Sequence, residues 1–177
     1  FAERAAEEGK TGNSVLLDRN AVTYLEGHRE IPCEEQGGIY FLNRNKLSLY
    51  KPDSNELTEV HQFDNVQDVY VANDRLYILD RSSNITIYNL LTQQEEKKLQ
   101  YGDHASSIGA DSKGRIYLAE SNGNGDDYDL YLLSPEGTLL SQALSEEAVY
   151  GFCGFDESNG NYYVDTYNNW RYWGYDH

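Results

Sequence analysis

The stretch Ile108-Gly109-Ala110-Asp111-Ser112-Lys113-Gly114-Arg115-Ile116-Tyr117-Leu118-Ala119-Glu120-Ser121 decides the fold of this chain. It contains an apolar run, a polar turn and a second run in which apolar residues flank a tyrosine. Asp, Ser and Gly favour tight turns, whereas β-branched and aromatic residues favour strands. The stretch therefore predicts two antiparallel strands joined by a turn over residues 111–114.

The tyrosine of the second run recurs along the chain with similar apolar neighbours. It occurs at Tyr40, Tyr77, Tyr117 and Tyr163, so the spacings are 37, 40 and 46 residues. A second short apolar segment follows each tyrosine, and the unit of four antiparallel strands in roughly 40 residues is typical of a β-propeller blade. An irregular β-sandwich does not require the same residue types to return at this interval. We therefore predict an all-β β-propeller of about four blades.

The segment from Ser107 to Leu140 resembles the blades of NHL-type and related six-bladed propellers in its inner strand, Asp/Gly turn and second strand. The other copies match more loosely, and the resemblance covers about residues 36–177. The chain departs from WD and kelch propellers, because no Trp-Asp dipeptide closes a blade and the Gly37-Gly38 pair occurs once. Since this architecture serves many functions, the resemblance implies a fold and little about activity.

The predicted organisation is a lead-in or linker over residues 1–13 and one propeller-like domain over residues 14–177. The last repeat stops after its third strand, and three explanations stay open. A strand within residues 14–25 could complete the ring, the chain could be part of a larger propeller, or two chains could complete one another as a homodimer. The predicted repeats are 31–64, 66–103, 105–147 and 149–177.

One face of the predicted propeller gathers the candidate binding residues. The loops between second and third strands and the links between blades lie on the same face, which favours recognition of a protein or a glycan there. Tyr167 and Trp170 flank an Asn-Asn turn and are suited to stacking on a sugar or anchoring a protein interface, whereas we expect Tyr163 and Trp173 to pack between blades. The candidate ligand-binding residues are Arg44, Arg81, His104, Glu120, Asp165, Tyr167 and Trp170.

An insertion between two predicted strands concentrates oxygen ligands that suit Ca²⁺. Its EF-hand pattern fails, because counting from Asn122 the sixth residue is Asp127 rather than Gly and the twelfth is Leu133 rather than Glu. A polar hairpin loop would contain the same residue types. We therefore predict no cofactor and keep Ca²⁺ as an alternative. The candidate metal ligands are Asn122, Asn124, Asp126, Asp127 and Asp129.

The sequence contains few patterns of catalytic chemistry. The histidines form no zinc-binding pair, no Gly-x-Ser-x-Gly motif occurs, and Cys33 and Cys153 permit one disulfide without establishing it. Gluconolactonase-like propellers hold a metal on carboxylates at the channel mouth, so a metal-dependent hydrolase or lyase centred on Asp68 and Glu120 is the alternative function. The equivalent positions Ser107 and Tyr150 are not carboxylates, which favours a non-enzymatic role.

Charge and composition limit the partners. The 177 residues contain 14 Lys and Arg against 30 Asp and Glu, giving a net charge of −16. This charge disfavours nucleic acid and anionic membrane surfaces, and no apolar run approaches the roughly 20 residues that span a bilayer. The absence of Met and the abundance of Tyr favour an extracellular or cell-surface location. We expect a recognition or scaffold module, with a structural part of a larger propeller as a further alternative.

Overall fold

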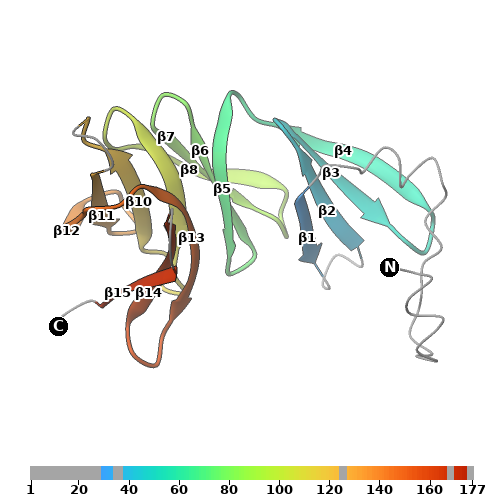
Figure 1. Ribbon diagram of the computed structural model, residues 1–177. Helices are drawn as coiled ribbons and strands as arrows, with labels where there is room; N and C mark the ends of the chain where they lie inside the picture. Colours follow the sequence, from blue (N-terminus) through green and yellow to red (C-terminus); the bar gives the residue numbers. More distant parts are fainter. Residues whose placement is uncertain (1–28, 34–37, 124–126, 167–169, 175–177) are drawn as a thin grey trace. The chain divides into compact units, whose positions relative to one another are not determined.

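The protein is all-β in the part of the chain that the structure describes. The structure is a computed structural model, and it describes residues 29–33, 38–123, 127–166 and 170–174 (Figure 1). These residues form fifteen strands in four antiparallel sheets, as predicted for an all-β repeat protein. Among them there is no helix that is long and apolar enough to cross a membrane. The predicted lead-in and the two N-terminal runs within 14–25 lie outside the described residues.

The chain divides into two compact units, Phe1–Phe63 and Asp64–His177, here called unit 1 and unit 2. Unit 1 contains one sheet with the strand order β1-β2-β3-β4. Tyr40, Leu47 and Tyr50 are buried in its two central strands, and the Phe63 backbone N donates to the Asn45 carbonyl at 2.7 Å. The strands are β1 (Arg29–Cys33), β2 (Gly38–Asn43), β3 (Lys46–Lys51) and β4 (Glu56–Gln62).

Unit 2 contains three sheets, in each of which sequential strands are hydrogen-bonded neighbours. Two sheets have four strands and the last has three, so four sheets in total fit the expected blade number. The first sheet is β5 (Val66–Ala72), β6 (Arg75–Asp80), β7 (Asn84–Asn89) and β8 (Gln94–Gln100). The second is β9 (Ala105–Ala110), β10 (Ile116–Ser121), β11 (Tyr128–Leu133) and β12 (Leu139–Ser145). The third is β13 (Val149–Asp156), β14 (Asn161–Thr166) and β15 (Trp170–Gly174).

The predicted turn between β9 and β10 is present and is held by Asp111. The Asp111 carboxylate is buried, and its Oδ1 accepts hydrogen bonds from the backbone N of Lys113 and of Arg115, both at 2.9 Å. The Gly114 N donates to the Asp111 carbonyl at 3.0 Å, with Gly114 at φ 77°. Because the left-handed region costs little for glycine, Gly114 closes this turn without strain. Arg115 Nε also pairs with Asp111 Oδ2 at 2.5 Å.

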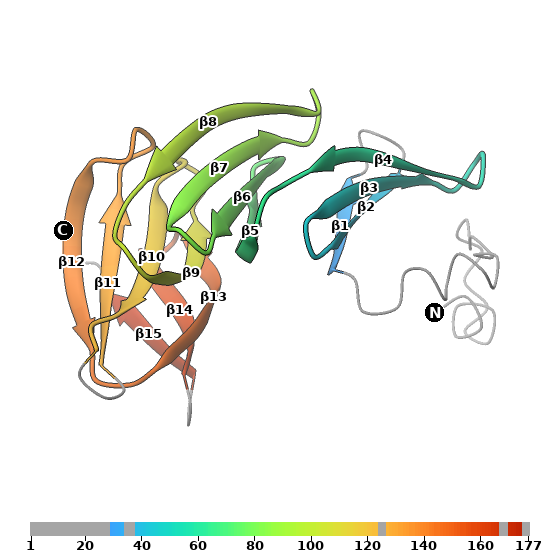
Figure 2. The same cartoon turned by 90° about the horizontal axis from the view of Figure 1, so that it is seen from above.

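The sheets of unit 2 pack face to face, with their first strands adjacent. Strands β5 and β9 are in contact, as are β9 and β13, whereas β8 and β12 lie at the outer edges (Figure 2). In the first two sheets of unit 2, the repeated tyrosine lies in the second strand and faces the sheet that follows. Tyr77 belongs to an apolar cluster with Ile108 and Leu118 of the second sheet, and Tyr117 packs against Phe152 and Tyr162 of the third.

The prediction that Tyr163 packs between blades is wrong for the described chain. Tyr163 has 36% of its surface exposed, whereas the adjacent Tyr162 is 4% exposed. Side chains alternate between the two faces of a strand, so Tyr162 and Val164 face the second sheet and Tyr163 faces away from it. Tyr163 lies on the same face of its sheet as Tyr117 does in the second sheet. Within the described residues, however, no further sheet follows the third one to cover that face. For Trp173 only the backbone is described.

Candidate functional site

The predicted binding residues of unit 2 that the structure describes lie at one end of its sheets, here called the loop face. It comprises the β6–β7 and β10–β11 connections, the β8–β9 and β12–β13 links, and the adjoining strand ends. Hydrogen bonds join these segments, since the Arg81 N donates to the Asn65 carbonyl at 3.1 Å and the Ala105 N donates to Ser83 Oγ at 3.0 Å. The strand assignment from sequence therefore brings several predicted residues to the same face.

The β6–β7 turn presents Arg81 to solvent. Asp80 ends β6, and its Oδ1 accepts hydrogen bonds from the backbone N of Ser82 and of Asn84 at 2.8 and 2.9 Å. Ser83 adopts φ 60° and is buried. The Asp80 carboxylate thus accepts the hydrogen bonds of turn amides that have no partner in the sheet, and so fixes the backbone of the turn. The side chain of Arg81 extends from this turn and is exposed.

On the loop face, the Glu120 side chain contacts the backbone of His104 and not its imidazole. Glu120 Oε1 accepts hydrogen bonds from the backbone N of Asp103 and of His104, at 2.8 and 2.5 Å. Gly102 lies so close that a Cβ there would be 2.8 Å from Glu120 Oε2. The Glu120 carboxylate therefore caps the β8–β9 link, which leaves the His104 side chain exposed.

Three of the predicted loop residues, Glu120, Asp165 and Trp170, belong to strand ends. Glu120 pairs with Asp129 across β10 and β11, and Asp165 pairs with Trp170 across β14 and β15. The ladders extend beyond the apolar residues from which the strands were predicted, because main-chain pairing does not depend on apolar side chains. Asp165 is exposed at the end of β14. Tyr167 lies outside the described residues, and for Trp170 only the backbone is described.

Tyr131 is the most strongly shifted titratable group of the loop face. Its burial raises the pKa to about 12, with smaller contributions from the nearby carboxylates of Asp129 and Glu120. The Tyr101 ring meets the Tyr131 ring edge to face, at 5.1 Å between centroids. This end of unit 2 thus combines carboxylates with an aromatic pair.

The predicted calcium ligands are only partly described, and Asn124 and Asp126 lie outside the described residues. The Asn122 N donates to the Asp127 carbonyl at 3.2 Å, which closes the base of the insertion as a hairpin. Asp129 Oδ1 accepts from Gln142 Nε2 at 3.2 Å. In the described part of the chain, no three His, Cys, Asp or Glu side chains are grouped as a metal site.

Asp68 and Glu120, the two carboxylates of the alternative metal-dependent hydrolase or lyase, accept hydrogen bonds from backbone amides. Asp68 Oδ2 accepts from the Ile108 N at 3.0 Å, and Glu120 is occupied by the β8–β9 link. A metal ion would have to compete with these hydrogen bonds. Cys153 is an exposed free thiol, and burial together with Asp165 raises its pKa, while the side chain of Cys33 is not described. Arg44 is exposed in the β2–β3 turn of unit 1, at φ 54°.

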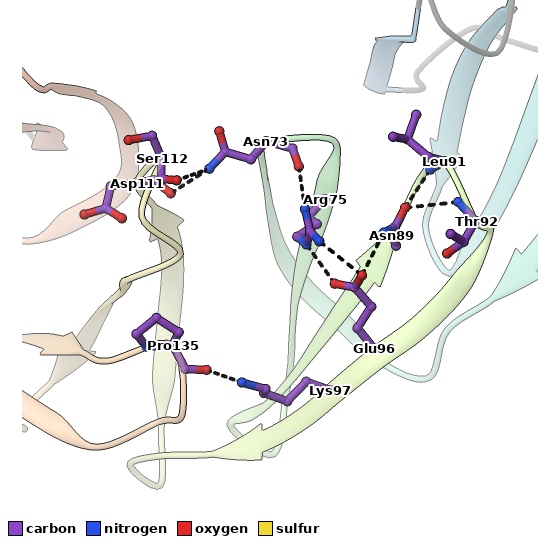
Figure 3. A network of polar contacts seen from close by, with 10 residues as sticks. All are labelled: Asn73, Arg75, Asn89, Leu91, Thr92, Glu96, Lys97, Asp111, Ser112 and Pro135. Atoms are coloured by element: carbon purple, nitrogen blue, oxygen red, sulfur yellow. Dashed lines mark hydrogen bonds and ion pairs between the residues drawn. The ribbon is translucent and has the colours of Figure 1, made fainter.

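A second group of polar residues, at the opposite end of the sheets, was missed by sequence reasoning. The β5–β6 turn bridges to the next sheet through Asn73 Nδ2, which donates to the Ser112 carbonyl at 2.6 Å, and Lys97 Nζ donates to the Pro135 carbonyl at 2.7 Å (Figure 3). Arg75 forms a fork with Glu96 through Nε and Nη2, at 2.7 and 3.2 Å. The only sequence signal was the turn chemistry at each site, which predicts turns and not their proximity.

A cavity of about 300 Å³ lies between these bridges, where the sheets β5–β8 and β9–β12 meet. Tyr77 and Ile87 form its buried apolar part, and charged side chains from both sheets surround them. Its lining residues are Asn73, Arg75, Tyr77, Ile87, Glu96, Lys97, Ser112, Lys113, Gly114 and Pro135.

The fold is shared with solved β-propellers. The chain is similar to BamB from Moraxella catarrhalis, with a TM-score of 0.54 and 10% identity, over 76% of this chain and 38% of that one. It is also similar to the WD40 domain of Toxoplasma gondii coronin, with a TM-score of 0.57 and 14% identity, over 78% and 40% of the two chains. The match to BBS1N, solved in complex with ARL6DN, has a TM-score of 0.56 and 15% identity, over 78% and 43%.

These likenesses define the fold class. The chain is a β-propeller repeat protein, as the tyrosine repeat predicted. It spans less than half the length of the solved structures that it matches. No family model matches the chain, and the comparison with curated proteins gave no match.

Proposed function

We propose that this chain is a non-enzymatic recognition module that binds a protein partner through the loop face of unit 2. The observation that supports this proposal is the way in which carboxylates fix the loops. Glu120 holds the backbone of the β8–β9 link and Asp80 holds the β6–β7 turn. A partner therefore meets a pre-organised surface, which reduces the entropy lost on binding.

The β12–β13 link has the same construction. The Glu147 N donates to Ser145 Oγ at 3.3 Å, and Thr166 Oγ1 donates to Glu147 Oε2 at 3.0 Å. This second contact connects the link to the end of β14, where Asp165 is exposed. The loop face is thus fixed on all three sheets of unit 2, while Arg81, His104 and Asp165 remain available to a partner.

The charge of the loop face favours a basic partner segment. Asp103, Glu146 and Asp165 are exposed there, together with Arg81. Carboxylates on a fixed surface attract Lys and Arg side chains over roughly the Debye length, about 10 Å at 0.1 M salt. Tyr167 and Trp170 would add aromatic anchors at the same end. An extracellular or cell-surface location belongs to this proposal.

Solved relatives of the fold give general support. One neighbour, BBS1N, was solved in complex with another protein, ARL6DN. Propellers use the same architecture for many functions, so the partner class rests on the surface of this chain and not on the likeness.

The proposal is tested by presenting the purified chain to a peptide array and a glycan array. We expect binding to Lys- and Arg-rich peptides, with affinity that falls as salt rises. Asp103→Lys should weaken this binding at least several-fold, whereas Glu136→Lys, the same charge change in the β11–β12 turn, should leave it unchanged. Binding to glycans alone, or equal effects of the two variants, would contradict the proposal.

The aromatic residues are tested separately. Tyr167→Ala and Trp170→Ala should each reduce peptide binding and leave the thermal unfolding midpoint unchanged. A large fall in the unfolding midpoint would instead place these side chains in the core.

A further inference from the structure

A cavity between the sheets β5–β8 and β9–β12 lies at the end of unit 2 opposite the loop face, and residues of both sheets line it. Its volume of about 300 Å³ is at the lower limit of small-molecule pockets. The bridge from Asn73 to Ser112 and the bridge from Lys97 to Pro135 join the two sheets on either side of it (Figure 3). These bridges fix the two walls relative to one another.

Tyr77 lines this cavity and places its hydroxyl near Gly114. The residue as a whole is 2% exposed, so its ring forms part of the cavity wall. The hydroxyl lies 3.8 Å from the position that a Cβ would take at Gly114, which is another lining residue. Burial raises the pKa of Tyr77, so the hydroxyl keeps its proton and can donate. A protonated hydroxyl that lines a cavity can donate to a ligand that accepts a hydrogen bond.

The charges around the cavity leave a positive excess. The one carboxylate of the lining, Glu96, already receives the fork from Arg75 and a hydrogen bond from Asn89 Nδ2 at 2.7 Å. Lys97 donates to a carbonyl, and neither Lys97 nor Lys113 forms an ion pair with a described carboxylate. In a chain of net charge −16, two such ammonium groups on one cavity form a local site for an anion.

We propose that this cavity binds an organic carboxylate, whose oxygens are received by the Tyr77 hydroxyl and the ammonium groups of Lys97 and Lys113, and whose carbon skeleton lies against the Tyr77 ring and Ile87. The apolar wall favours an organic anion over inorganic phosphate, because phosphate would have to give up hydration against carbon surface. The guanidinium fork that would suit phosphate is held by Glu96. The carboxylate can belong to a free short-chain acid or to the C-terminus of a peptide.

The experiment uses the whole chain labelled with ¹⁵N and four probes in two matched pairs. The first pair is 3-methylbutanoate and its uncharged amide, and the second is acetyl-Gly-Gly-Leu with a free or an amidated C-terminus. We expect each carboxylate that binds to shift the amide signals of Ile87, Ser112, Lys113 and Gly114, and we expect no such shift from the amides. Binding of the free acid alone identifies a small-molecule ligand, and tighter binding of the peptide identifies a protein C-terminus.

Three variants test the assigned residues. Tyr77→Phe removes only the hydroxyl and should weaken binding about tenfold or more. Lys113→Gln should weaken it about two- to fivefold, as for an exposed charge. Lys98→Gln is the matched control, because Lys98 lies outside the lining and pairs with Glu95 at 2.9 Å. No shift with either carboxylate, equal shifts with the amides, or unchanged affinity in Tyr77→Phe would overturn the proposal.

Discussion

Asp68 on β5 accepts a hydrogen bond through Oδ2 from the backbone N of Ile108 on β9, at 3.0 Å. The two residues are separated by one repeat of the sequence, and they join the first strands of successive sheets in unit 2. A charged acceptor bonded to a backbone amide contributes more than a neutral pair. The carboxylate that the metal-dependent alternative assigned to chemistry is therefore part of the attachment between blades.

Replacement of Asp68 tests this structural role. We expect Asp68→Ala to lower the free energy of unfolding by about 1–3 kcal/mol, because the Ile108 amide loses a charged acceptor in a partly buried position. Asp68→Asn should cost less, since its side-chain carbonyl still accepts. Urea denaturation followed by tyrosine fluorescence measures both. Glu146→Ala, on the exposed β12–β13 link, is the control, and an Asp68→Ala midpoint equal to that of the control would contradict the role.

Gly109 and Gly151 offer a matched test of how closely β9 and β13 pack. A Cβ at Gly109 would lie 2.8 Å from Cβ of Phe152, whereas a Cβ at Gly151 meets nothing within 4 Å. Overpacking of this kind typically costs about 1–3 kcal/mol. Gly109→Ala should therefore lower the thermal unfolding midpoint by several degrees, and Gly151→Ala should leave it nearly unchanged. Equal midpoints for the two variants would show that the sheets are not packed this closely.

Glu120 should act on the loop face through the backbone of the β8–β9 link. Glu120→Ala removes the acceptor of the Asp103 and His104 amides, so we expect hydrogen exchange at these two amides to become about tenfold faster or more. Exchange in β14 should stay unchanged. The comparison variant is Asp165→Ala, since Asp165 is exposed. Unchanged exchange at residues 103 and 104 in Glu120→Ala would show that the carboxylate does not hold the link.

The sequence was sufficient to predict the second and third strands of each sheet, because a second apolar segment follows each repeated tyrosine. The pattern around Asp111 and Tyr117 specifies local structure, and local structure repeated at this interval limits the fold to a propeller. Whether the Tyr163 side chain is buried or exposed was not predictable in the same way. Its burial depends on whether a further sheet covers its face, and no residue near Tyr163 reports that.

The candidate sites were less accessible to sequence reasoning than the fold. Glu120 was correctly placed on the loop face, but its hydrogen bonds to the Asp103 and His104 amides depend on the closeness of Gly102, which no pattern encodes. The cavity was missed entirely. The apolar neighbours of Tyr77 in the sequence predict a core residue. The proximity of Lys113 to Lys97 arises only when the two sheets pack together.

The Arg75–Glu96 pair predicts an acid-dependent contribution to stability. Hydrogen bonds from Asn89 and then from Arg75 lower the pKa of Glu96 below its ordinary value of 4.5. A carboxylate with a lowered pKa in the folded state contributes stability above about pH 4.5, and this contribution is lost as the pH falls through the folded-state pKa. Glu96→Gln should therefore be less stable than the parent at pH 7, by about 1 kcal/mol.

The difference between the two proteins should shrink as the pH falls below 4.5. Urea midpoints measured at neutral pH and at several pH values below 4.5 test this, with Glu136→Gln as an exposed control that should follow the parent at every pH. Because Lys98 and Glu95 lie on the same strand outside the cavity, their pair is not altered by the Glu96 substitution. A constant difference between Glu96→Gln and the parent at all pH values would show that the ionised form of Glu96 is not what stabilises the wall of the cavity.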